Sequence, residues 1–128
     1  MRKTSDMSIE AHSVLVVEDD ADIRDAMVGI LESEGYSVSA ASHGGEALAQ
    51  LQAGNRPCLI LLDLMMPVMD GWTFCREKAK DPSYASIPIV VVSAITRQDP
   101  RNAGLKPVDH LFKPVDVGKL LATVGRYC

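Results

Sequence analysis

Three short runs of uninterrupted apolar residues constrain the fold of this chain most strongly. They lie at residues 14–17, 58–62 and 89–92, and none of them alternates between apolar and polar positions. Strands of this kind need cover on both faces, as in a parallel sheet with helices on each side. Two weaker runs, at residues 37–40 and 109–112, complete a set of five predicted strands.

Helical patterns separate the predicted strands. Gly35 suits a left-handed helix end, and Asp116 suits the N-cap of the last helix. Pro100, Gly104 and the nearby Pro107 interrupt the segment 96–106, so we expect a short or irregular fourth helix there. The remaining helical signals are Ile23, Met27, Ile30 and Leu31; Ala47, Leu48 and Leu51; residues 71–80; and Val117, Leu120, Leu121 and Val124.

The alternation of strands and helices predicts an α/β fold with a doubly wound, five-stranded parallel sheet and right-handed crossovers. A chain of 128 residues fits one domain. Residues 1–12 are polar and lack a periodic pattern. We therefore expect a flexible N-terminal extension over residues 1–12 and one domain over residues 13–128.

Charge, hydropathy and cysteine number exclude several classes of protein. The formal net charge is −4 without a Lys/Arg cluster, which argues against direct nucleic-acid binding. The longest apolar run, residues 58–62, is far shorter than the ~20 residues of a membrane span, and residues 1–12 hold no hydrophobic signal segment. Three cysteines without CxxC spacing indicate reduced thiols rather than a disulfide framework or a zinc site, and hence a cytoplasmic protein.

Polar side chains follow four of the predicted strands directly. Because parallel strands end at one edge of a sheet, we expect these side chains to converge there. Clustered carboxylates repel one another unless a cation or proton compensates, and an all-oxygen donor set favours Mg²⁺. An ammonium and a hydroxyl beside them would bind phosphoryl oxygens, so the edge predicts phosphoryl chemistry on a carboxylate. The residues are Glu18, Asp19 and Asp20 after the first strand, Asp63, Ser93 and Lys113.

Four sequence segments carry a resemblance to a known family. They are VLVVEDD at residues 14–20, LLDLMMPVMDG at 61–71, VVSA at 91–94 and FKP at 112–114. In this order, they resemble the receiver domain of two-component response regulators, and in particular a chemotaxis-protein-like stand-alone receiver. The resemblance implies a flavodoxin-like sheet with strand order 2-1-3-4-5 and a phosphorylation-activated signalling switch. It implies no enzyme beyond catalysis of its own phosphorylation and dephosphorylation.

The resemblance also implies roles for single residues. Asp63 would accept a phosphoryl group from a sensor histidine kinase or a histidine phosphotransfer protein, with Lys113 and Ser93 contacting that group. Mg²⁺ would be bound by Glu18, Asp19, Asp63 and the backbone carbonyl of Met65, and the Lys113–Pro114 bond would be cis. The downstream protein target stays unknown, and neither nucleic acid nor membrane is expected as a partner.

Two features depart from the usual pattern of this family. His110 occupies the position of an aromatic switch residue, three residues before Lys113, where a Tyr or Phe is usual. Its imidazole is smaller and titratable, so the switch would be altered or pH-sensitive. The interrupted segment 96–106 replaces an amphipathic helix, so partner surfaces do not transfer to this chain.

Alternative interpretations stay open at this stage. Asp20 is suited to a helix N-cap rather than to metal binding, and Ser93 could simply bond to the backbone. An aspartyl-phosphate phosphatase-type enzyme is a second functional class. Such an enzyme would need a DxD pair at the end of the first strand, whereas this chain has Glu18, Asp19 and Asp20 there. A receiver-like binding module that is never phosphorylated is a third.

Overall fold

The computed structural model describes residues 10–128, which alternate strands and helices along the chain. The strands are β1 (Glu10–Val17), β2 (Ser37–Ala41), β3 (Pro57–Leu62), β4 (Ile89–Ser93) and β5 (Asp109–Phe112). The helices are α1 (Ala21–Ser33), α2 (Gly44–Gln52), α3 (Gly71–Lys78) and α4 (Val117–Tyr127), with a 3₁₀ helix, η1 (Pro100–Gly104), between β4 and β5. The predicted element order is confirmed.

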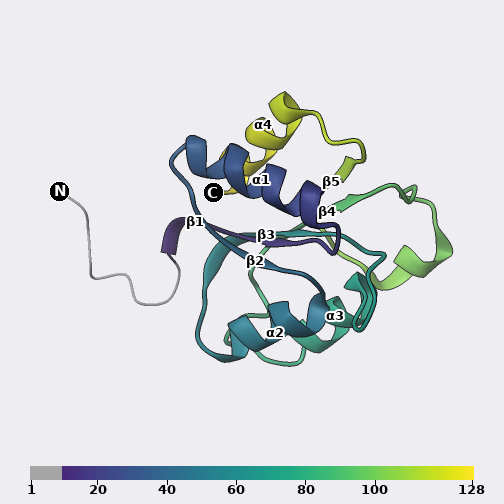
Figure 1. Ribbon diagram of the computed structural model, residues 1–128. Coiled ribbons are helices and arrows are strands. Elements are labelled where there is room, and N and C mark those ends of the chain that lie inside the picture. Colours follow the sequence, from purple (N-terminus) through teal and green to yellow (C-terminus); the bar gives the residue numbers. More distant parts are fainter. Residues whose placement is uncertain (1–9) are drawn as a thin grey trace.

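The strands form one parallel sheet in the order β2-β1-β3-β4-β5, which confirms the predicted topology. Helices α1 and α4 cover one face of the sheet and α2 and α3 cover the other (Figure 1). Alternate residues of β1 serve the two layers: Val14 and Val16 pack with α1 and α4, whereas Leu15 and Val17 pack with α2 and α3. Both strand faces are therefore buried, which explains why the run is continuously apolar.

Side-chain caps fix where the helices begin. The Asp20 carboxylate accepts hydrogen bonds from the N–H groups of Asp22 and Ile23, and the Asp116 carboxylate accepts one from Lys119, as predicted. Gly35 adopts a φ of 92° just after α1, which is also as predicted. The cap of α2 was not predicted: His43 Nδ1 accepts from the N–H groups of Gly45 and Glu46.

The structure differs from the sequence prediction at the ends of several elements. Strand β1 begins at Glu10, so residues 10–12 belong to the sheet rather than to an extension; residues 1–9 lie outside the described part of the chain. The register between β1 and β3 shifts between Glu10 and Val14, and His12 in between has a φ of 61°. Helix α3 ends at Lys78 rather than at residue 80. The expected short fourth helix is the single 3₁₀ turn of η1.

The cysteine prediction is wrong for two of the three residues. Cys58, near the start of β3, and Cys128, at the end of α4, form a disulfide with a Cα–Cα distance of 5.6 Å. They are 70 residues apart in sequence, so spacing rules for short motifs could not reveal the pair. Cys75 is a free thiol, as predicted.

None of the helices formed by residues 10–128 is long and apolar enough to cross a membrane.

Gly71 brings the start of α3 close to the end of β3. A Cβ atom built there would lie 2.5 Å from the Asp63 carbonyl oxygen and 2.8 Å from Leu64 Cα. Both neighbours are backbone atoms, which cannot move away without displacing the strand end. Gly71 therefore permits the close approach that sets the position of Asp63.

We predict that Gly71→Ala lowers the free energy of unfolding by about 2–3 kcal/mol, because the added methyl group collides with backbone. Gly29→Ala, in the middle of α1, is the matched control, since nothing lies within 4 Å of its Cβ position. It should stabilise the protein by about 0.5–1 kcal/mol through helix propensity. Urea titration of both variants measures the two effects. Equal stability of the two variants would contradict the assigned role of Gly71.

Candidate functional site

The carboxyl end of β1 places Glu18 at the edge of the sheet. Its side chain is only 2% exposed, and its Oε2 accepts a hydrogen bond of 3.1 Å from the Asp20 N–H. Its backbone is held on both sides: the N–H donates to the Ala41 carbonyl, and the carbonyl accepts from Arg24 Nη1 at 2.9 Å. Glu18 is thus a fixed, buried carboxylate. Asp19, beside it, is exposed.

The end of β3 places Asp63 next to Glu18. The Asp63 N–H donates to the Val17 carbonyl at 3.0 Å, which continues the pairing of β3 with β1 for one residue beyond the strand. Its side chain is 6% exposed, and its Oδ1 lies 3.4 Å from the Met65 N–H that donates to it. Adjacent parallel strands therefore bring the two carboxylates together, as the sequence predicted.

Lys113, directly after β5, reaches both carboxylates. Its Nζ lies 2.7 Å from Glu18 Oε1 and 3.4 Å from Asp63 Oδ2. The Lys113–Pro114 peptide bond is cis, as the family resemblance implied. The Lys113 side chain as a whole is 20% exposed, whereas those of Glu18 and Asp63 are almost completely buried.

Burial and mutual proximity shift the pKa values of Asp63 and Lys113. Burial, and after it the negative charge of Glu18, raise the pKa of Asp63 to about 7, although the Lys113 ammonium acts in the opposite direction. Burial alone would lower the pKa of Lys113. The hydrogen bond to Glu18 and the charge of Asp63 outweigh that effect, so the pKa of Lys113 is raised.

The carboxylates fit a hard divalent cation. One oxygen from each of Glu18, Asp19 and Asp63 can be chosen so that all three lie within 4.8 Å of one another. Glu18 Oε1 is buried and, within residues 10–128, forms an ion pair with Lys113 but satisfies no hydrogen bond of regular geometry. An all-oxygen donor set with one exposed member is the kind that Mg²⁺ uses while it retains water ligands.

Ser93 and His110 lie outside this cluster of direct contacts. Ser93, at the end of β4, is 1% exposed, and its Oγ accepts a 3.1 Å hydrogen bond from the Ile95 N–H. The buried His110 ring stacks on Phe112 with 4.3 Å between ring centroids, and its Nε2 has no hydrogen-bond partner among residues 10–128. Burial lowers the pKa of His110, and the positive charge of Arg97 adds to that effect.

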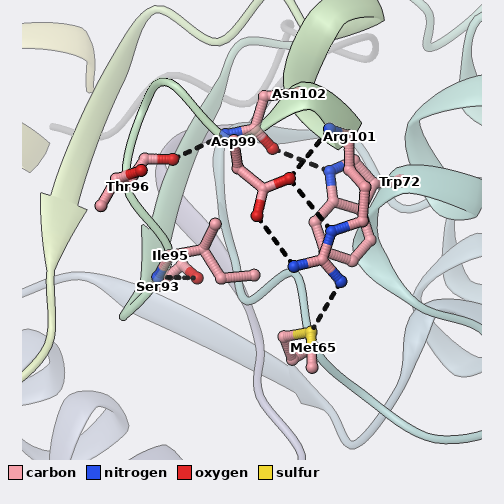
Figure 2. A network of polar contacts seen from close by, with 8 residues as sticks. All are labelled: Met65, Trp72, Ser93, Ile95, Thr96, Asp99, Arg101 and Asn102. Atoms are coloured by element: carbon pink, nitrogen blue, oxygen red, sulfur yellow. Dashed lines mark hydrogen bonds and ion pairs between the residues drawn. The ribbon is translucent and has the colours of Figure 1, made fainter.

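Sequence reasoning missed a polar network that connects η1 to the loop after Asp63 (Figure 2). Arg101 donates to Asp99 at 2.8 Å, lies 4.6 Å from the centre of the Trp72 ring, and has its Nη1 3.6 Å from Met65 Sδ. Trp72 Nε1 donates to Asn102 Oδ1 at 2.8 Å. Trp72, near the start of α3, thereby anchors η1 to that helix. The sequence around Pro100 and Arg101 predicts only an irregular segment and does not specify these long-range contacts.

The sequence matches the family model of the response regulator receiver domain over residues 14–125. This chain belongs to the response regulator receiver family. The match covers the ends of β1, β3, β4 and β5, and therefore all predicted site residues.

Curated relatives share the same domain. The uncharacterised 14.6 kDa protein in the sodA1 3′ region of Leptolyngbya boryana is 37% identical over 117 residues, which cover 90% of this chain and 88% of that protein. Response regulator PleD of Caulobacter vibrioides is 42% identical, and the DNA-binding transcriptional regulator RpaA of Synechocystis is 40% identical. Each alignment covers 87% of this chain but only 25% of PleD and 46% of RpaA, so the chain corresponds to a part of those two relatives.

Solved receiver structures have the same fold. The receiver domain of a signal transduction histidine kinase from Syntrophus aciditrophicus gives a TM-score of 0.81 at 31% identity, covering 90% of this chain and 88% of that one. The chemotaxis response regulator CheY4 of Vibrio cholerae gives 0.81 at 30% identity, covering 91% and 98%. The receiver domain of the sensor histidine kinase PA1611 of Pseudomonas aeruginosa gives 0.81 at 28% identity, covering 90% and 95%, and its structure contains a coordinated magnesium ion in the active-site cleft.

We predict that the metal-free protein loses stability as pH rises from 5 to 8. The pKa of Asp63 is raised from 3.8 to about 7 by folding, so its contribution is full below pH 4 and is lost as pH rises through 7. The lowered pKa of His110 acts with the opposite sign in the same window, because folding favours its neutral form. The difference in the free energy of unfolding between wild type and Asp63→Asn isolates the contribution of the Asp63 carboxyl group, because His110 is present in both proteins.

Chemical unfolding in the presence of a chelator measures this difference. Asp63→Asn should gain about 1–2 kcal/mol relative to the wild type between pH 5 and pH 8. Asp25→Asn, an exposed substitution on α1, is the control and should follow the wild-type curve. A constant difference between Asp63→Asn and wild type across this range would contradict the raised pKa.

Proposed function

We propose that this chain is a phosphorylation-activated signalling switch in which Asp63 accepts a phosphoryl group. The observation that carries the proposal is the position of the Lys113 ammonium, 2.7 Å from Glu18 and 3.4 Å from Asp63 at one edge of the sheet. The phosphoryl donor would be a sensor histidine kinase or a histidine phosphotransfer protein. The downstream partner is another protein, and neither nucleic acid nor membrane binds this domain directly. We place the protein in the cytoplasm.

The proposed reaction is a transfer between two nucleophiles. A carboxylate oxygen of Asp63 forms a bond to phosphorus while the bond from phosphorus to the donor histidine nitrogen breaks, which yields an acyl phosphate. Transfers of this type depend mainly on positioning and charge neutralisation. Lys113 supplies a positive charge beside Asp63 Oδ2, where a phosphoryl oxygen would add negative charge. The catalysed reaction is this chain's own phosphorylation and dephosphorylation, so it is not a turnover enzyme.

Glu18, Asp19, Asp63 and the Met65 carbonyl would hold Mg²⁺. When bound, the cation neutralises part of the carboxylate charge and polarises the phosphoryl oxygens. The oxygen cluster within 4.8 Å supports this assignment, and so does the magnesium ion in the similar PA1611 receiver domain.

Ser93 and His110 are the proposed switch residues. The Ser93 hydroxyl oxygen accepts from the Ile95 N–H, and among residues 10–128 the hydroxyl donates no hydrogen bond, so its proton is available to a phosphoryl oxygen on Asp63. His110 lies three residues before Lys113 with its ring buried against Phe112, and a shift of Ser93 toward Asp63 would change the space beside β5. The downstream protein that would read this change stays unknown.

The phosphoryl acceptor can be tested directly. Incubation with acetyl phosphate and Mg²⁺ should add about 80 Da to the wild type, the mass of one phosphoryl group on a carboxylate. Asp63→Asn should show no addition because it keeps the shape but lacks the nucleophilic anion. Asp25→Asn, which removes an exposed carboxylate from α1, is the matched control and should label normally.

Intact-protein mass spectrometry also separates the two alternatives. A phosphatase-type enzyme would release phosphate continuously without a stable adduct, and a module that is never phosphorylated would show neither adduct nor turnover. Labelling of Asp63→Asn at the wild-type rate would overturn the assignment of Asp63.

We predict slow loss of the phosphoryl group. Met65 and Ile95, two residues after Asp63 and Ser93, are apolar and offer no side-chain group to orient an attacking water. Alternatively, the flexible Met65 side chain could move out of the path of the attacking water. The 3.6 Å contact of its sulfur with Arg101 Nη1 opposes that movement. Phosphorylated Asp63 should therefore persist well beyond seconds.

Combined Met65→Asn and Ile95→Thr substitutions should speed hydrolysis about tenfold, which corresponds to ~1.4 kcal/mol of barrier. Val68→Asn changes an apolar residue of the same loop that is 85% exposed, and it should leave the rate unchanged. The half-life of the phosphorylated protein after removal of the donor gives the rate. Wild-type loss within seconds, together with no effect of the double substitution, would show that these side chains do not limit hydrolysis.

A further inference from the structure

The disulfide between Cys58 and Cys128 joins two elements at the edge of the sheet opposite to Asp63. Cys58 is the second residue of β3, whose other end carries Asp63. Cys128 caps the end of α4, and Lys113 lies three residues before Asp116, the N-cap of that helix. The cross-link therefore connects the far ends of the two segments that carry the acceptor and its lysine.

The surroundings of the two sulfur atoms accommodate free thiols as well as the bonded state. Cys58 Sγ lies 2.9 Å from the Ser13 carbonyl oxygen, and Cys128 Sγ lies 3.7 Å from the same oxygen. A thiol can donate a hydrogen bond to that carbonyl, so reduction leaves no buried donor without a partner. Both residues are only partly buried, which gives small reagents access to them.

The backbone already holds the two cysteines at a suitable separation. Their Cα atoms are 5.6 Å apart, within the range that disulfides span without backbone movement. The last turn of α4 is fixed independently, because Arg126 Nη1 pairs with Asp109 Oδ2 at 2.8 Å and the Tyr127 hydroxyl donates to the Val108 carbonyl at 3.0 Å. These contacts keep the thiols close together when the covalent bond is absent.

We propose that Cys58 and Cys128 are a redox modification site, at which a reversible disulfide makes the anchoring of α4 on β3 depend on the thiol–disulfide balance around the protein. The oxidant is a small disulfide such as oxidised glutathione. One protein thiolate attacks it, forming a mixed disulfide and releasing one glutathione thiolate. The second protein thiolate then attacks the protein sulfur of that mixed disulfide and releases the second glutathione.

The balance of this exchange is complete. Two protein thiols lose two electrons and two protons, and one molecule of oxidised glutathione becomes two of reduced glutathione. Cys75 provides an internal contrast, since it has no cysteine partner and burial raises the pKa of its thiol to about 11. Little of the reactive thiolate therefore exists at that position at neutral pH.

The cross-link should stabilise the fold strongly because the bonded residues are 70 positions apart. A disulfide that closes a long loop restricts the unfolded chain more than one that closes a short loop. The oxidised protein should therefore melt about 10 °C above the reduced protein.

The test uses the full 128-residue chain equilibrated in oxidised or reduced glutathione, followed by mass spectrometry and thermal melting. Wild type and Cys75→Ser should each lose about 2 Da on oxidation, melt about 10 °C higher, and return to the starting values with excess reduced glutathione. Cys58→Ser and Cys128→Ser should show neither change, and in the reduced state they should melt close to the wild type.

Other results would overturn the proposal. These are a stable mixed disulfide with glutathione on either cysteine of the wild type, a disulfide-linked dimer through Cys128, or an unchanged melting temperature after the 2 Da loss. The measurement needs no phosphoryl donor, so its outcome is independent of whether Asp63 is the phosphoryl acceptor.

Discussion

The ion pair between Lys113 and Glu18 is the interaction on which the arrangement of the site depends. Glu18 is almost completely buried, and an isolated charge there would be costly. The Lys113 ammonium at 2.7 Å provides the compensating charge and at the same time contacts Asp63. Strands β1, β3 and β5 contribute one member each, so the pair also links the central strands to the edge of the sheet.

The parallel topology makes this convergence unavoidable. Each strand enters the sheet from the same side, so all four polar strand ends lie at one edge while the apolar residues before them fill two helix-covered layers. Gly71 adds a local requirement, because only a residue without a side chain lets α3 start against the Asp63 carbonyl. Two constraints therefore position Asp63: the packing of the start of α3 against its backbone, and the charge interaction of its carboxylate with Lys113.

Features that depend on local pattern could be predicted from the sequence. Continuous apolar runs located the strands, and their ends located Glu18, Asp63 and Lys113, because the carboxyl ends of parallel strands lie at one edge of a sheet. The strand order itself came only from the family resemblance. Features that depend on long-range placement could not be predicted. The partner of Cys58 lies 70 residues away, and the contacts of Arg101 depend on the irregular path between β4 and β5. The N-cap of α2 by His43 was not predicted, because a histidine side chain accepts hydrogen bonds from backbone N–H groups only when the ring nitrogen concerned, here Nδ1, is unprotonated.

Either a proton or a cation can compensate the excess negative charge of the carboxylates at this edge of the sheet. Glu18, Asp19 and Asp63 carry three negative charges when ionised, and Lys113 compensates only one. Without a further cation, the repulsion and burial raise the pKa of Asp63 to about 7, which favours its protonated and non-nucleophilic form. A divalent cation among the carboxylates would favour the ionised form instead, so metal binding and the availability of the Asp63 nucleophile are thermodynamically linked. In the proposed phosphorylated state, a phosphoryl group on Asp63 would add about two more negative charges, and the same cation and Lys113 would oppose their repulsion from Glu18. The excess of carboxylates over ammonium groups would therefore make the proposed acceptor dependent on a cation before phosphorylation as well as after it.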